Sequence, residues 1–224
     1  MNKPEFHLAY LHGFASSARS VMGAWLAREL EAVGYELHLP ELNVPSFYEL
    51  TFSEALRVMD RLDADVARTG RPWRLVGSSM GGYLAARWAQ LNPGRVDRLL
   101  LLAPGFDLPA RWPHLVGQKR MERWEAQGEL KLPGPDERMQ PVSWNFIEDA
   151  RTHEPWPQVE CPVVIVHGRR DPTVPVASSR RYVEMYPEVR LVEVEDRHQL
   201  KDSRDTIWSE MVQLFEIKGQ MDRM

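Results

Sequence analysis

Four consecutive leucines, residues 99–102, lie in the stretch 96–103 and constrain the fold more than any other feature of the sequence. A strand exposed on one face alternates apolar and polar side chains, whereas a strand covered on both faces is apolar throughout. The leucines therefore predict a central strand of a parallel sheet. Further strands are expected at residues 6–11, 35–39, 73–76, 162–166 and 190–194.

Between these six expected strands, apolar residues recur at helical spacing. The expected helices lie at residues 19–33, 53–68, 80–91, 176–186 and 205–217. Strands that alternate with helices build a mainly parallel sheet with helices on both faces. The sequence thus predicts an α/β fold, a three-layer α/β/α sandwich around a six-stranded sheet. Because ligands bind such sheets at the carboxyl ends of the strands, functional residues are expected directly after strands.

Residues 107–157 break this alternation, and we call them the insertion. They contain four of the eight tryptophans, Trp112, Trp124, Trp144 and Trp156. A structureless loop of this length is unusual, so we expect a helix at 118–127, a hairpin at 130–142 and a helix at 144–151. The insertion is predicted to be a lid over the site, and the alternative is a helical decoration remote from it. Residues 1–106 and 158–224 would form the core.

The bulk composition narrows the class of protein. The chain has 224 residues, which suits one domain with an insertion, and its net charge of -4 gives no reason to expect a nucleic-acid partner. The longest apolar stretch, residues 99–104, is too short to span a membrane, and no secretory signal is recognised at the start. Cys161 is the single cysteine and is interpreted as a small core residue. We expect a cytoplasmic protein without a membrane partner, and a homodimer is compatible with the sequence.

The sequence Gly77-Ser78-Ser79-Met80-Gly81 matches the pattern G-x-S-x-G between an expected strand and an expected helix. In this context a sharp turn holds the serine at its apex, and small residues two positions away leave room for the backbone. The turn presents the hydroxyl at the N-terminus of the next helix, where free N–H groups favour a developing negative charge. Ser79 is therefore the predicted nucleophile. The alternative is a glycine-rich turn that binds a phosphate or only packs.

A serine hydroxyl needs a neighbouring base, and the base needs an orienting carboxylate. In this type of fold the acid and the base follow the serine in that order. Asp171 comes after the expected strand 162–166 and is the predicted acid, although an aspartate before Pro172 is also typical of a turn. Asp107 is the fallback acid. His198 lies between the last strand and the last helix and is the predicted base; the alternative is a surface histidine.

Two backbone N–H groups are expected to bind the oxyanion. One belongs to Met80, the residue after the predicted nucleophile. The other belongs to Phe14, in the loop His12-Gly13-Phe14 after the first strand, where a plain turn is the alternative. Side chains that could also touch a substrate are His12, Trp112, Trp144 and Phe146.

Four segments in this order resemble the α/β-hydrolase superfamily: LHGF, GSSMGGY, HGRRDPTVP and DRHQL. Two longer segments, LHGFASSARS and LVGSSMGGYLAARWA, are also similar to the small bacterial esterases of the YqiA/YcfP group. The resemblance implies hydrolysis of a small-molecule ester or thioester through an acyl-enzyme, without a metal or an organic cofactor. The sequence departs from the family's pattern in two ways: the first two of the usual eight strands are expected to be absent, and the insertion is longer than expected for the smallest esterases of this group. The alternatives are a non-catalytic binding protein, a serine peptidase or an acyltransferase on the same scaffold.

Overall fold

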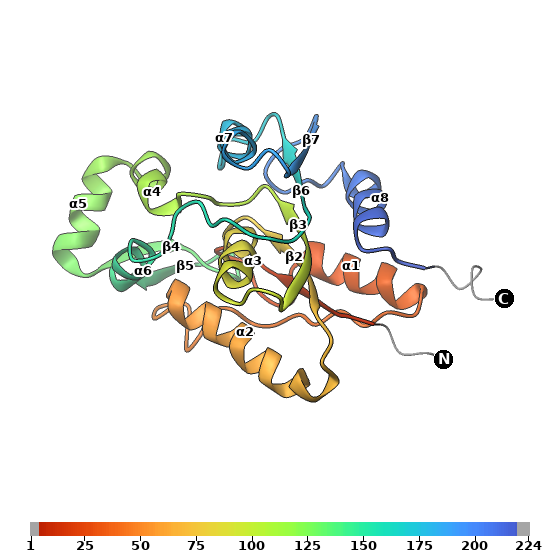
Figure 1. Cartoon of the computed structure of the whole chain (residues 1–224). Helices are drawn as coiled ribbons and strands as arrows, with labels where there is room; N and C mark the ends of the chain where they lie inside the picture. Colours follow the sequence, from red (N-terminus) through yellow and green to blue (C-terminus); the bar gives the residue numbers. More distant parts are fainter. Residues whose placement is uncertain (1–4, 219–224) are drawn as a thin grey trace.

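The computed structural model describes residues 5–218, and a parallel sheet forms its centre (Figure 1). The strand order is β1-β2-β3-β6-β7. The strands are β1 (His7–Leu11), β2 (Trp73–Ser78), β3 (Val96–Leu102), β6 (Val163–Gly168) and β7 (Arg190–Val194). Because all neighbours are parallel, the carboxyl ends of these strands lie at one edge of the sheet.

Helices cover both faces of the sheet (Figure 1). Helices α1 (Val21–Ala32) and α8 (Arg204–Leu214) lie on one face. Helices α2 (Phe52–Val66), α3 (Met80–Leu91) and α7 (Ala177–Met185) lie on the other, and the short helix η1 (Ala67–Thr69) extends α2. In β3, Leu99 and Leu101 face the second group of helices and Leu100 and Leu102 face the first. The predicted α/β/α sandwich is therefore confirmed.

The sheet has one strand fewer than predicted. Residues 35–39 run beside β1 but form only an isolated bridge between Ala9 and His38. Pro40 follows directly and has no N–H to donate to a ladder. Leu37 and Leu39 are only half-buried, so little apolar burial favours a longer pairing. The prediction of a six-stranded sheet is thus wrong, and residues 5–218 form a five-stranded sheet.

The insertion folds into three helices and two strands. They gather on one side of the sandwich, and the first of these helices was not expected (Figure 1). These elements are α4 (Leu108–Val116), α5 (Gln118–Gln127), β4 (Glu129–Pro133), β5 (Met139–Ser143) and α6 (Asn145–Ala150). All but α4 lie within a few residues of the predicted ranges. Helix α4 was not predicted because it contains two prolines, which usually indicate the absence of a helix. Pro109 occupies the first turn of α4, where the missing N–H costs nothing, and Pro113 lies inside the helix.

The insertion shares one apolar core with the sandwich. Trp112, Trp124 and Phe146 are buried and belong to the same cluster as side chains of α2 and α3. Two tyrosines of the sandwich also hold the end of the insertion: Tyr83 Oη donates to Glu154 O at 2.8 Å, and Tyr182 Oη donates to Pro157 O at 2.6 Å. No helix in residues 5–218 is long and apolar enough to cross a membrane.

Asp149 of α6 joins the insertion to the first turn of α2. Its carboxylate accepts the Ser53 N–H at 2.9 Å and the Ser53 hydroxyl at 2.5 Å, and it lies 3.5 Å from His153 Nε2. Burial opposes the charge, but the hydrogen bonds from His153 and Ser53 outweigh burial and lower the pKa of Asp149 to about 2. The free N–H groups at the start of α2 also favour a carboxylate at this position.

We expect Asp149→Asn to lower the free energy of unfolding by about 1–2 kcal/mol at neutral pH, after allowance for solvent screening. The pKa of this carboxyl is lower in the folded chain than its value of about 3.9 in an unfolded chain. Its contribution is therefore present above about pH 4 and is lost as the pH falls towards 2. Urea unfolding at neutral pH and near pH 2 measures this, with the exposed Asp65→Asn as control. A deficit of the same size at both pH values would contradict the prediction.

Candidate active site

Ser79, His198 and Asp171 meet at the carboxyl-end edge of the sheet, although 119 residues separate the serine from the histidine. His198 Nε2 lies 3.0 Å from Ser79 Oγ, and His198 Nδ1 lies 2.6 Å from Asp171 Oδ2. An ionised carboxylate can only accept, so Nδ1 carries the hydrogen and Nε2 faces the hydroxyl with its lone pair. The three side chains thus form one chain of hydrogen bonds, from hydroxyl to imidazole to carboxylate.

A strained backbone presents Ser79 between β2 and α3. Its φ of 53° and ψ of -120° lie in a region that residues with a Cβ rarely adopt. Neighbouring backbone holds the residue there: the Ser79 N–H donates to Leu102 O, and the Ser79 carbonyl accepts from Gly82 and Gly105, each at 2.9 Å. Strain of this kind persists only where its surroundings enforce it, which is typical of functional sites.

Gly81 is a position at which this turn tolerates no side chain. A Cβ there would overlap the carbonyl oxygens of Leu11 and His12, at the end of β1. We expect Gly81→Ala to lower the free energy of unfolding by about 3 kcal/mol or more, because backbone on both sides must move apart. Chemical denaturation measures the loss. Gly105→Ala is the matched control, since its Cβ would lie 3.4 Å from Met80 N, at ordinary contact distance; equal losses in both variants would contradict the prediction.

The carboxylate of Asp171 has a complete set of hydrogen-bond donors. Oδ1 accepts the N–H groups of Thr173 and Val174 at 2.8 and 2.9 Å. Oδ2 accepts from His198 and lies 3.3 Å from His167 Nε2. Burial opposes the charge, but the hydrogen bonds from the two histidines outweigh burial and hold the pKa of Asp171 well below its usual range. The carboxyl is therefore ionised at neutral pH, as an orienting acid must be.

Asp107, the fallback acid, has a different environment. It follows β3 and precedes α4 with a φ of 52°, and within residues 5–218 its side chain has no hydrogen bond to His198. Burial raises the pKa of Asp107, against the opposing charges of Arg181 and Arg111. The structure thus places Asp171, and not Asp107, on the imidazole.

Phe14 and Met80 each lie next in sequence to a residue of this turn or of the loop that approaches it. Met80 is the first residue of α3, where a helix leaves its N–H groups unpaired. The loop before Phe14 approaches closely, since a Cβ on Gly13 would lie 3.2 Å from Ser79 Cβ. Within the described part of the chain, neither N–H donates to a protein acceptor. An oxyanion requires free backbone donors of this kind near the nucleophile.

His12 points into the protein. It is fully buried, with Nδ1 2.9 Å from Gly13 O and Nε2 3.0 Å from Glu41 Oε1. The Leu42 N–H donates to Nε2 at 3.0 Å, and the carboxylate of Glu41 accepts the Ala18 N–H at 3.2 Å, so residues 41 and 42 hold the loop that contains Phe14. This placement argues against the expected substrate contact of His12 and favours a role in holding the loop in place.

The other expected substrate contacts form an aromatic cluster around Phe14. The ring of Phe14 lies 5.2 Å, between centroids, from each of Trp112, Phe146 and Phe47. Trp144 instead packs against another tryptophan of the insertion. Phe47 was not predicted as a site residue, because residues 43–50 have no periodic pattern and its aromatic ring is the sole signal in the sequence. Two of the three aromatic predictions thus lie beside the candidate oxyanion donor, and Trp144 lies further away.

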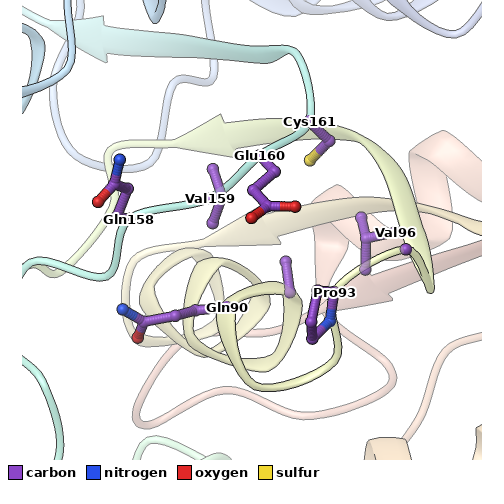
Figure 2. A pocket seen from close by; sticks show the side chains of 9 residues that line it. Gln90, Pro93, Val96, Gln158, Val159, Glu160 and Cys161 are labelled. Atoms are coloured by element: carbon purple, nitrogen blue, oxygen red, sulfur yellow. The ribbon is translucent and has the colours of Figure 1, made fainter.

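A cavity of about 300 Å³ lies at the opposite, amino-terminal edge of the sheet (Figure 2). It is bounded by the end of α3, the start of β3 and the segment before β6, and contains none of the predicted site residues. Cys161 lines it, and burial raises the pKa of this thiol to about 11, so the sulfur stays protonated. A protonated thiol is a poor nucleophile, in agreement with the interpretation of Cys161 as a packing residue.

Comparison with known proteins gives relatives that are named as esterases. The rat palmitoyl-protein thioesterase ABHD10, mitochondrial, is 30% identical over 143 residues, which are 60% of this chain and 48% of that protein. A pimeloyl-[acyl-carrier protein] methyl ester esterase from Chromobacterium violaceum is 27% identical over 175 residues, 60% of this chain and 68% of that protein. The chain thus spans about half the length of the rat relative.

The solved structure of mouse alpha/beta hydrolase domain-containing protein 10 has a TM-score of 0.77 and 20% identity, and the match covers 97% of this chain and 93% of that one. This likeness confirms the α/β-hydrolase fold that the sequence motifs predicted. A family model matches residues 7–216, from β1 to beyond the last helix. The chain therefore belongs to the family described as Uncharacterised protein family (UPF0227).

Proposed function

We propose that this protein is a serine hydrolase that cleaves carboxylic ester or thioester bonds through an acyl-enzyme on Ser79. The observation that carries the proposal is the hydrogen-bonded chain from Ser79 Oγ through His198 to Asp171, with contacts of 3.0 and 2.6 Å. The N–H groups of Phe14 and Met80, which donate to no protein acceptor within residues 5–218, add support. A turn that only packs would not require a strained serine in contact with an imidazole that is hydrogen-bonded to a carboxylate.

In the proposed reaction, Ser79 Oγ attacks the carbonyl carbon while His198 Nε2 takes the hydroxyl proton. The carbonyl π electrons move onto oxygen, which accepts hydrogen bonds from the two backbone N–H groups. The tetrahedral intermediate collapses and expels the alcohol or thiol, which receives the proton from the imidazolium. Water then attacks the acyl-enzyme while His198 takes its proton. The second tetrahedral intermediate expels Ser79 Oγ, which receives that proton from the imidazolium, and the acid product leaves. Asp171 holds the imidazole in the Nδ1–H tautomer throughout.

The surroundings support a small to medium, apolar acyl group. Phe14, Phe47, Trp112 and Phe146 form one aromatic cluster, which includes the residue proposed to supply an oxyanion donor. The insertion supplies two of these rings, so we propose that it covers the bound acyl chain as a lid. The named relatives act on a palmitoyl thioester and on a methyl ester, which supports an ester or a thioester as the bond cleaved.

Covalent labelling tests the proposal directly. We expect a fluorophosphonate probe to add one adduct to the wild-type protein, located on the peptide that contains Ser79 by mass spectrometry. p-Nitrophenyl acetate, butyrate and octanoate and the matching acyl-CoA thioesters are then compared with p-nitroanilides. Turnover of esters or thioesters without anilides supports the proposal, whereas faster cleavage of anilides would make the protein a peptidase. If the probe does not label the protein and no substrate is turned over, the protein is a binding protein on this scaffold.

A further inference from the structure

His167 is a second buried histidine at the acid, and the reaction described above does not use it. It lies in β6, four residues before Asp171, and is fully buried. Its Nε2 is 2.8 Å from Val174 O and 3.3 Å from Asp171 Oδ2, and its Nδ1 is 2.7 Å from Ser179 Oγ. Both ring nitrogens therefore have partners in the protein.

These partners determine where the hydrogens lie on the ring. The carbonyl of Val174 can only accept, so Nε2 carries a hydrogen. The hydroxyl of Ser179, itself fully buried, can donate to Nδ1, which leaves the ring neutral. The Nε2–H is then shared between Val174 O and the carboxylate of Asp171, as a three-centre hydrogen bond.

The oxygen that receives this hydrogen bond also receives His198. Asp171 Oδ2 lies 2.6 Å from His198 Nδ1, while Oδ1 accepts two backbone N–H groups. We infer that His167 is a positioning residue for the reaction proposed above: its Nε2–H fixes the direction of Asp171 Oδ2 and draws part of the carboxylate charge away from His198. The inference rests on the proposed function, since it concerns the same acid.

Within residues 5–218, charged or titratable side chains from three elements interact with Asp171. They are His198 from the loop after β7, His167 from β6, and Arg111 from α4, which donates to Thr173 O at 3.1 Å. The attraction between Arg111 and Asp171 favours the charged forms of both groups. Loss of His167 leaves the arginine in place, so the carboxylate stays ionised. Without the hydrogen bond from His167, more of the negative charge of Asp171 acts on His198 and favours its protonated form. The acidic limb of kcat/KM against pH therefore moves to higher pH.

We expect His167→Leu to lower kcat/KM by about 10–100-fold, because Oδ2 loses its fixed direction. The acidic limb of kcat/KM should move to higher pH by about half a unit to one unit. His167→Gln keeps an N–H donor and is expected to recover most of the rate and the original limb. Equal losses in both variants, with the acidic limb unmoved, would overturn the inference.

A measurement on the wild type keeps the inference testable if a variant does not fold. Long-range 1H–15N NMR of the histidine-labelled protein, assigned with His167→Gln or by backbone connectivity, reports the tautomer. We expect a neutral ring with the hydrogen on Nε2; a hydrogen on Nδ1 alone would reject the inference. Absence of fluorophosphonate labelling in the wild type would instead reject the proposed function, whatever the tautomer of His167.

Discussion

Replacement of Ser79 by alanine is expected to reduce ester hydrolysis by about 10⁴-fold or more and to abolish fluorophosphonate labelling. The reason is that the acyl-enzyme cannot form without the hydroxyl, while the oxyanion donors and the histidine remain. The turnover of the best p-nitrophenyl ester measures the loss. Wild-type rates in this variant would remove Ser79 from the mechanism.

Ser79→Gly is the matched control for folding, because glycine lacks the Cβ that makes a φ of 53° unfavourable. Both variants should be equally inactive. The glycine variant should be more stable than the alanine variant by about 1 kcal/mol or more, since only glycine relieves the backbone strain. Equal stability of the two variants would show that the turn is not strained at this residue.

Asp171→Asn is expected to reduce kcat/KM by about 10³–10⁴-fold with little change in substrate binding. The amide oxygen can still accept the backbone N–H groups of Thr173 and Val174, so its NH₂ group must face His198. An amide donor opposite Nδ1 forces the imidazole hydrogen onto Nε2. The base then meets Ser79 with an N–H instead of a lone pair and cannot accept the hydroxyl proton.

Steady-state kinetics across pH measure this effect, and Asp107→Asn is the control. Asp107 also follows a strand at this edge, but its side chain lacks a hydrogen bond to His198 within residues 5–218. We expect near-normal rates for that control. If Asp107→Asn lowered kcat/KM strongly and Asp171→Asn did not, Asp107 would be the acid instead of Asp171.

A double variant, Ser79→Ala with Asp171→Asn, should be no less active than Ser79→Ala alone. The three side chains act as a unit, so the rate acceleration that depends on them is already lost in Ser79→Ala. Replacement of Asp171 as well causes no further loss. Two losses that multiply would mean that the residues act independently, which the continuous hydrogen-bond chain does not predict.

Local features of the sequence determined the layers of the fold and the position of the turn at Ser79. The four leucines of β3 require burial on both faces, and the fold satisfies this with helices on each side. Gly77 and Gly81 allow a backbone approach that any side chain would prevent. These properties depend on residue type and spacing along a short segment, so they could be derived without coordinates.

Tertiary packing decided which distant groups meet. Asp107 and Asp171 both follow strands. Asp171 meets His198 because these residues lie in the loops after β6 and β7, which are neighbours in the sheet. The same packing turned His12 inward to Glu41, placed His167 against the acid, and left residues 35–39 with a single bridge. A side chain's direction and partners at the end of a strand depend on elements many residues away. Short-range periodicity contains no information about those elements, and therefore only the folded chain could reveal these contacts.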